Sequence, residues 1–192
     1  QGDPVGIICL QETSGAAGLL YQYLPGKGFQ VFTCYEQQNC GGRSYVIAVK
    51  DGVGLKVLEK GRIDLTGYRE QETSPTRIPF SVSLKYGEQE IGIYTLHATR
   101  GGRRFEALQL FSAYLAAREG RIIVAGDLNI TVETGTEDVD GYARRISELF
   151  EGFNGFDHNL DFILGRGVKL EDGINSEGSC SDHMPVSAKI QL

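Results

Sequence analysis

No stretch of the sequence approaches the roughly 20 uninterrupted apolar residues that cross a lipid bilayer, so a membrane-spanning helix is excluded. The features of a signal peptide are also missing, because residues Gln1 to Pro4 contain neither a basic nor an apolar region. No C-x-x-C pair occurs among the four cysteines, which argues against a thiolate zinc site. We therefore expect a chain that is either cytosolic or already processed.

An excess of basic residues is missing as well. Lysine and arginine total 19 against 25 aspartate and glutamate residues, and the formal net charge is −6. Proteins that bind polyanions over a large surface usually carry a basic excess, so the composition argues against that class. It remains compatible with a local basic patch around a metal site.

The composition is otherwise that of an ordinary soluble domain. Of the 192 residues, 41% are hydrophobic and 23% are charged. A chain of this length buries roughly 70% of the surface that its unfolded form exposes, which is enough for one continuous core. Because the sequence shows no repeat, low-complexity tract or linker, we expect residues 1–192 to form a single domain.

Two of the cysteines, Cys34 and Cys40, flank a short polar loop. They would form a small disulfide in an oxidising compartment, and two unbridged thiols are an equally good interpretation. Cys9 lies within an apolar run, so we expect a buried free thiol there.

Short apolar or β-branched runs alternate with two or three helical patterns along the chain. Two hairpins are expected, one through Asp51-Gly52 and one through Gly87. The first joins residues 44–50 to 54–60, and the second joins residues 79–86 to 90–96. Helices are expected up to Leu24, over residues 103–118 and up to about residue 150, and further strands at residues 5–10, 29–34, 121–125, 160–164 and 185–190. This mixture predicts an α/β sandwich with mixed sheets.

Polar residues with catalytic potential stand at the ends of several of these strands. Side chains at strand ends can meet in one crevice although they are far apart in the sequence. Singly, each has a structural interpretation as a cap, a turn former or a surface residue. Jointly they provide the oxygen donors that Mg²⁺ prefers and histidines for proton transfer. They are Glu12, His97, Asp127, Asn129, Asp182 and His183.

Four motifs occur in an order and character typical of one superfamily. They are Ile8-Cys9-Leu10-Gln11-Glu12-Thr13, Gly126-Asp127-Leu128-Asn129, Leu160-Asp161-Phe162-Ile163-Leu164 and Ser181-Asp182-His183-Met184-Pro185. With His97 they resemble the endonuclease/exonuclease/phosphatase superfamily over nearly the whole chain. Three further segments, Gly41-Gly42-Arg43, Arg77-Ile78-Pro79 and His97-Ala98-Thr99-Arg100, are most similar to its DNase-like branch, in particular to the catalytic B subunits of cytolethal distending toxins. The resemblance implies a four-layered α/β sandwich of two mixed β-sheets flanked by helices.

The resemblance also implies a role for each matching residue. Glu12 and Asp182 resemble the carboxylates that bind the divalent cation. Asp127 resembles the group that orients or deprotonates the attacking water, and Asn129 resembles the group that holds a phosphate oxygen.

The remaining roles concern the phosphate and the histidines. His97 and His183 resemble the histidine pair that flanks the scissile phosphate, and Asp161 resembles the carboxylate that holds His183 in its useful tautomer. Arg77 resembles the arginine that grips the phosphate in the DNase branch, and Arg100 resembles a contact to the nucleic-acid backbone. A solvated charge in a hairpin is the alternative for Arg77.

The sequence departs from the superfamily in two places. The superfamily usually begins with a strand whose asparagine adds a metal-side ligand, and no such strand precedes Val5, so we expect a fold that lacks the usual first strand. Either that strand is supplied in another way or the metal site works with fewer protein ligands. The acid that supports His97 in pancreatic-type DNase would fall near Asn39, which is not an acid.

Together these residues meet the requirements of phosphodiester hydrolysis: a metal to neutralise charge, a base for water and donors for the phosphate oxygens. We expect a phosphodiesterase that uses Mg²⁺, or another divalent cation such as Mn²⁺ or Ca²⁺, and acts as an endonuclease on DNA. As the catalytic subunit of a toxin it would be secreted and have delivery subunits as partners; a cytoplasmic location is the alternative. A phosphatase that acts on a phosphoinositide or another phosphomonoester and a catalytically inactive nucleic-acid-binding module are the alternative functions.

Overall fold

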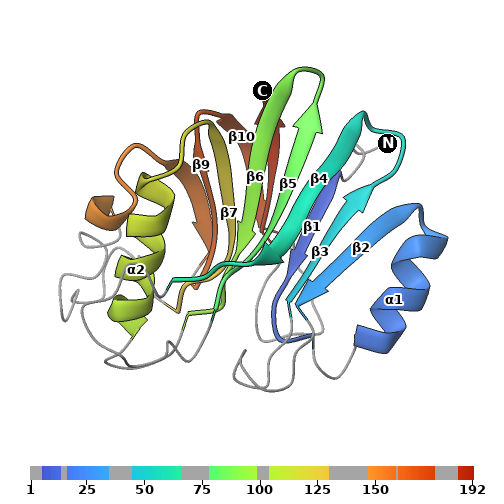
Figure 1. Ribbon diagram of the computed structural model, residues 1–192, viewed down its shortest axis with the longest axis horizontal. Helices are drawn as coiled ribbons and strands as arrows, with labels where there is room; N and C mark the ends of the chain where they lie inside the picture. Colours follow the sequence, from blue (N-terminus) through green and yellow to red (C-terminus); the bar gives the residue numbers. More distant parts are fainter. Residues whose placement is uncertain are drawn as a thin grey trace.

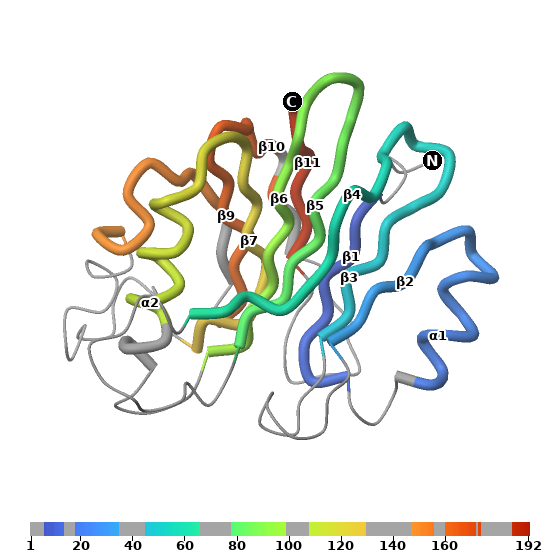
Figure 2. The backbone as a smooth tube through the Cα atoms, viewed as in Figure 1, coloured from blue at the N-terminus to red at the C-terminus, as the bar shows by residue number. Residues whose placement is uncertain are grey.

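The computed structural model describes residues 6–13, 17–34, 45–65, 78–98, 104–129, 147–158, 160–175 and 186–192. Two β layers lie face to face, and each is covered on its outer side by a helix (Figures 1 and 2). Because polar side chains at the strand ends meet between these layers, the layers position the candidate site.

The larger layer is a six-stranded sheet with the strand order β4-β5-β6-β7-β9-β8. Among its described strands, β6 and β7 form the one parallel pair, and helix α2 (Arg104–Ala116) connects them. Parallel neighbours need such a crossover because the chain must return to the same end of the sheet. The strands are β4 (Leu55–Arg62), β5 (Phe80–Tyr86), β6 (Gln89–Thr95), β7 (Arg121–Asp127), β8 (Asn154–His158) and β9 (Asp161–Arg166).

The second layer consists, within the described residues, of two antiparallel sheets. Strands β1 (Ile7–Leu10), β3 (Tyr45–Lys50) and β2 (Phe29–Cys34) form one sheet in the order β1-β3-β2. Strands β10 (Lys169–Asn175) and β11 (Val186–Gln191) form the other. Strand β3 is central and covered on both faces, so its first five residues are all buried.

Three apolar clusters hold the layers together. The cluster between the two β layers takes residues from both sheets of the second layer, such as Ile47 and Leu170, and from the larger sheet, such as Val82. Helix α2 packs Leu108, Phe111 and Leu115 against the outer face of the larger sheet. Helix α1 (Ala17–Gly26) packs Leu20 and Leu24 against the outer face of the three-stranded sheet. Each fully buried side chain of this size contributes about 1.5–3 kcal/mol through removal of apolar surface from water.

The α/β sandwich with a mixed sheet that the sequence predicts is therefore confirmed. The hairpin expected through Asp51-Gly52 is wrong, because β3 pairs within the three-stranded sheet whereas β4 pairs with β5 in the other layer. The hairpin through Gly87 is confirmed by the β5–β6 pairing. The sequence pattern does not predict strands β8 and β10. The absence of the usual first strand stays a prediction, since residues 1–5 lie outside the described residues.

Two further expectations concern membranes and thiols. Within the described residues, no helix combines the length and the apolar character needed to cross a membrane. Cys9 carries a free thiol and is partly buried, and burial raises the pKa of this thiol to about 12. Cys34 is buried on β2, and Cys40 lies outside the described residues, so a bridge between them stays a prediction.

Candidate active site

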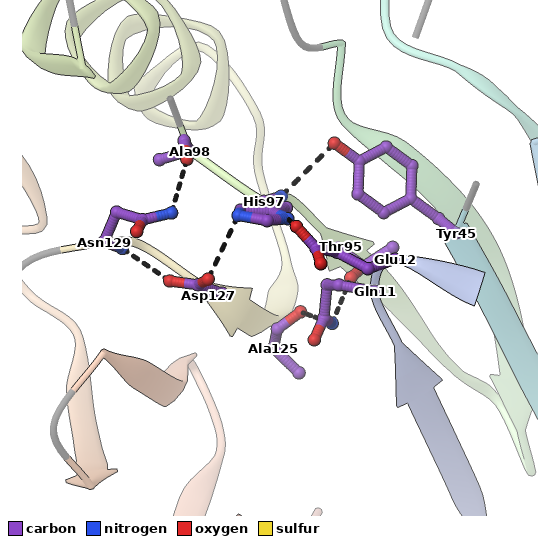
Figure 3. Close-up of polar contacts among 9 residues, drawn as sticks. All are labelled: Gln11, Glu12, Tyr45, Thr95, His97, Ala98, Ala125, Asp127 and Asn129. Carbon is purple, nitrogen blue, oxygen red and sulfur yellow. Dashed lines mark hydrogen bonds and ion pairs between the residues drawn. The ribbon is translucent and has the colours of Figure 1, made fainter. Parts of the chain in front are cut away.

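Polar side chains from both β layers meet where β1, β6 and β7 end (Figure 3). Glu12 follows β1 in the three-stranded sheet, and His97 follows β6 in the larger sheet. Asp127 is the last residue of β7, and Asn129 follows it after Leu128. These are four of the residues whose convergence the sequence predicts, and the structure places them together.

The imidazole of His97 lies between two carboxylates. Its Nδ1 is 3.2 Å from Oε1 of Glu12, and its Nε2 is 3.1 Å from Oδ2 of Asp127. Both contacts can be hydrogen bonds only in the imidazolium form, because a neutral ring carries a single N–H. The side chains of His97 and Asp127 are 3% and 5% exposed, whereas that of Glu12 is 50% exposed, so the site reaches solvent on the Glu12 side.

A close backbone approach brings His97 and Asp127 side by side. The two residues form an isolated parallel bridge that continues the β6–β7 pairing, and the backbone N–H of Ala98 donates to the carbonyl of Asp127 at 2.7 Å. A Cβ at Gly126 would overlap the carbonyl oxygen of Leu96, so this approach requires glycine. The glycine of the Gly-Asp-Leu-Asn motif is therefore explained by packing between the strands.

The rest of that motif anchors and orients the carboxylate. Leu128 is fully buried in the cluster beneath α2, and its N–H donates to the carbonyl of Leu160 at 2.9 Å. The backbone N–H of Asn129 donates to Oδ1 of Asp127 at 2.7 Å, and its side-chain amide donates to the carbonyl of Ala98 at 2.6 Å. Both oxygens of Asp127 therefore have partners within the protein, one at Asn129 and one at His97.

Glu12 and Asn129 have left-handed backbones, with φ values of 55° and 53°. Within the described residues, they are the two non-glycine residues with positive φ. Asparagine adopts this conformation readily, but glutamate pays a steric penalty of about 1–2 kcal/mol. The sharp turn after β1 points the Glu12 side chain toward His97 (Figure 3), and strain of this kind clusters at functional sites.

Two side chains that the sequence analysis did not single out also reach the site. Gln11 donates through Nε2 to the hydroxyl of Thr95 at 2.9 Å, and the hydroxyl of Tyr45 accepts a hydrogen bond from the backbone N–H of His97 at 3.3 Å. For Gln11 the sequence does contain a signal, because the polar pair Gln11-Glu12 directly follows an apolar strand. Nothing in the local sequence distinguishes Tyr45 from other aromatic residues in strands.

Of the other expected site residues, the structure describes only Asp161. Asp161 lies opposite Asp127 in the β7–β9 ladder, so it belongs to the same end of the larger sheet. Arg77, Arg100, Asp182 and His183 lie outside the described residues, as does Asn39. The carboxylates of Glu12 and Asp127 both contact the His97 ring.

The described residues do not by themselves enclose a metal ion. Among them, no group of three or more histidine, cysteine, aspartate or glutamate side chains has the arrangement needed to hold one. The half-exposed carboxylate of Glu12 nevertheless provides the hard oxygen donor that Mg²⁺ takes, and Mg²⁺ is commonly held by one or two carboxylates with water and substrate phosphate. The donor chemistry therefore fits a divalent cation at Glu12.

Helices packed on a two-layered β sandwich, with an acid–histidine cluster at the strand ends, define the class of DNase-like α/β sandwiches. Comparison with protein-family models identifies the family: the chain belongs to the Endonuclease/Exonuclease/phosphatase family, whose model matches residues 1–183. The superfamily membership inferred from the sequence motifs is thereby confirmed. No curated protein sequence matches the chain.

Solved structures with the same fold come from several organisms. TDP2 from D. rerio, complexed with a single-strand DNA product, has a TM-score of 0.73 at 16% identity, with 97% of this chain and 86% of that chain covered. An endonuclease/exonuclease/phosphatase from Bacteroides vulgatus has a TM-score of 0.74 at 15% identity, covering 98% and 85%. The mannosyl-6-phosphatase Bt3783 of Bacteroides thetaiotaomicron has a TM-score of 0.67 at 18% identity, covering 97% and 85%. At these identities the likeness is one of fold.

Proposed function

We propose that this protein is a divalent-metal-dependent phosphodiesterase that acts as an endonuclease on DNA. The observation that carries the proposal is the buried His97 held between Glu12 and Asp127 at the ends of three strands. Family membership supports hydrolysis of a phosphoester, and the TDP2 structure with its DNA product supports a nucleic-acid substrate. The similarity of the motifs to the DNase-like branch favours an endonuclease.

The chain's own residues divide the chemistry between them. Asp127, fixed by the Asn129 N–H, would stabilise a positive charge on the His97 ring. Glu12 would hold the cation, which when bound neutralises phosphate charge and activates water. Nδ1 of His97, which lies on the Glu12 side of the ring, would donate a proton or a hydrogen bond to a phosphate oxygen. A group in this role contributes about 10²- to 10⁴-fold to the rate.

Nicking of supercoiled plasmid DNA by the intact chain with Mg²⁺ tests the proposal. We expect EDTA to abolish nicking and Glu12→Gln to reduce it by at least about 100-fold. Glu90→Gln is the matched control, because Glu90 is exposed near the start of β6, at the opposite end of the strand from Thr95; it should leave the rate unchanged. Nicking that survives EDTA or Glu12→Gln would overturn the proposal.

The mannosyl-6-phosphatase with the same fold makes a phosphomonoester the second substrate to assay. Release of inorganic phosphate from a sugar phosphate or an inositol phosphate is measured with the same three proteins. Phosphate release without DNA cleavage would show that the protein is a phosphatase and not an endonuclease. Binding of DNA with neither activity would instead indicate a nucleic-acid-binding module.

A further inference from the structure

Gln11 joins the two β layers at the level of the candidate site. It follows β1, in the three-stranded sheet, yet its Nε2 donates to Oγ1 of Thr95 at 2.9 Å and lies 3.5 Å from the carbonyl oxygen of Ala125. Thr95 ends β6 and Ala125 lies in β7, so one carboxamide contacts two adjacent strands of the opposite sheet (Figure 3). Thr95 is fully buried, which shields this contact from water.

The three strands that Gln11 joins are the strands that deliver the acid–histidine cluster. Thr95 stands two residues before His97, Ala125 stands two residues before Asp127, and Gln11 itself precedes Glu12. Residues two apart in a strand are held on the same face, so fixing the first fixes the direction of the second. The hydrogen bonds of Gln11 therefore act on the two strand segments that carry His97 and Asp127, and Gln11 itself is the chain neighbour of Glu12.

A second cross-layer contact acts on the same segment. Tyr45 is fully buried in β3, and its hydroxyl accepts a hydrogen bond from the His97 backbone N–H at 3.3 Å. Gln11 holds Thr95 and Tyr45 holds His97, so both ends of the segment 95–97 are attached to the three-stranded sheet. We call Gln11 and Tyr45 the cross-layer clasp.

We propose that the cross-layer clasp is a positioning device: it holds His97 of one sheet at contact distance from Glu12 of the other. Its catalytic consequence rests on the proposed function, whereas its effect on the His97 ring does not. Apolar packing between the layers is not directional, so it specifies the position of individual side chains less sharply than hydrogen bonds do. Hydrogen bonds have narrow distance and angle requirements, so they define the register at the site.

Removal of single hydrogen-bonding groups tests the clasp. Gln11→Met keeps the length of the side chain and deletes its donor, and Tyr45→Phe deletes only the hydroxyl. Two variants serve as matched controls. Gln30→Met, on β2 of the three-stranded sheet, removes an exposed hydrogen bond to Asp51. Tyr86→Phe, on β5, removes the hydroxyl of a tyrosine that is 46% exposed. Thr95→Val and Thr95→Ser give an independent pair, because only serine retains the hydroxyl that accepts from Gln11.

Kinetics distinguish positioning from simple stabilisation. At a temperature where urea unfolding shows every variant to be folded, we expect Gln11→Met, Tyr45→Phe and Thr95→Val each to lower kcat by about 10- to 100-fold while KM changes by less than about threefold. Thr95→Ser should recover most of the lost rate, and the two controls should match the wild type. If kcat per folded molecule is unchanged in these variants, the clasp is only structural and the proposal is wrong.

A second readout does not require activity. The chain has three histidines, so the ring signals of His97 in a ¹H–¹⁵N spectrum can be assigned by their loss in His97→Gln. We expect these signals to shift in Gln11→Met, Tyr45→Phe and Thr95→Val but not in Gln30→Met or Tyr86→Phe. If the wild type hydrolyses no phosphoester and the shifts occur, the proposed function fails and the clasp stands. Unchanged ring signals in the folded clasp variants overturn the clasp whatever the activity.

Discussion

The Nε2 atom of His97 lies 3.1 Å from Oδ2 of Asp127, and the two residues extend a parallel strand pair beyond the end of β6. The contact is nine-tenths or more buried on both sides, so solvent screens it weakly. Because Oδ1 of Asp127 is held by the Asn129 N–H, the carboxylate has one orientation toward the ring. The charge of Asp127 is thus available to the histidine rather than to solvent.

Asp127→Asn should lower kcat by about 10²- to 10⁴-fold, because the amide keeps the shape of the side chain but not the charge facing His97. The rate of phosphodiester cleavage by the folded variant measures the effect. Asp51→Asn is the matched control, since Asp51 is exposed and accepts a hydrogen bond only from Gln30 among the contacts described for it. Equal rates for the two variants would show that Asp127 has no part in the reaction.

Glu12→Gly should be more stable than Glu12→Ala by about 1 kcal/mol, because glycine adopts the positive φ of this position without steric cost. Both variants lose the carboxylate, so the difference between their free energies of unfolding reports the backbone strain alone. At Glu90, in the regular strand β6, the order should be reversed, with glycine about 0.5–1 kcal/mol less stable than alanine. Urea unfolding of the four variants gives the free energies of unfolding. An alanine variant that is the more stable one at position 12 would contradict the strain at Glu12.

Gly126→Ala should lower the free energy of unfolding by about 2–3 kcal/mol, because the added methyl group overlaps the Leu96 carbonyl and forces β6 and β7 apart. The rate should fall as well, since the same two strands carry His97 and Asp127. Gly61→Ala on β4 is the control: a Cβ there has no neighbour within 4 Å, so stability should be unchanged or slightly higher. Equal stability of the two variants would refute the close approach at Gly126.

The Cys9 thiol should make stability fall in alkaline solution. Its pKa rises from 9.0 in the unfolded chain to about 12 in the folded one because the thiol is buried. Below pH 9 the thiol is protonated in both states, and above pH 9 the unfolded state loses the proton first, so the free energy of unfolding decreases as pH rises toward 12. The free energy of unfolding of the wild type, relative to that of Cys9→Ala, should therefore be about 1.4 kcal/mol lower at pH 10 than at pH 8. Parallel urea titrations at the two pH values measure it, and a constant difference would contradict the burial of the thiol.

Backbone amide exchange should alternate along β1. Lys50 donates to the carbonyl of Gly6, so Gly6, Ile8 and Leu10 face β3, and the backbone groups of Ile7 and Cys9 point to the opposite edge. Within the described strands that edge has no paired neighbour, so the amides of Ile7 and Cys9 should exchange faster than those of Ile8 and Leu10. Protection of all four amides would show that a further strand covers β1, against the expectation that the usual first strand is lacking.

Several elements could be predicted because their signals are local. Helix α2 has apolar residues at helical spacing and lies within the predicted range 103–118, and the predicted strand 29–34 coincides with β2. The hairpin through Asp51-Gly52 could not be judged in this way, because a Gly-containing turn looks the same whether the next strand stays in its sheet or crosses to the other layer. Strands β8 and β10 contain glycine, asparagine and charged residues, and only their pairing with β9 and β11 makes them strands.

The residue types at the strand ends were determined by the sequence alone: Glu12, His97, Asp127 and Asn129 each stand next to an apolar run, and this made their convergence predictable. Only the tertiary structure decided how they meet. It pairs His97 with Glu12 and Asp127, places Gln11 and Tyr45 across the two layers, and requires glycine beside Leu96. The physical reason is that periodicity and turn chemistry act between neighbours in the chain, whereas contact between two sheets depends on how their faces pack, which no local pattern records.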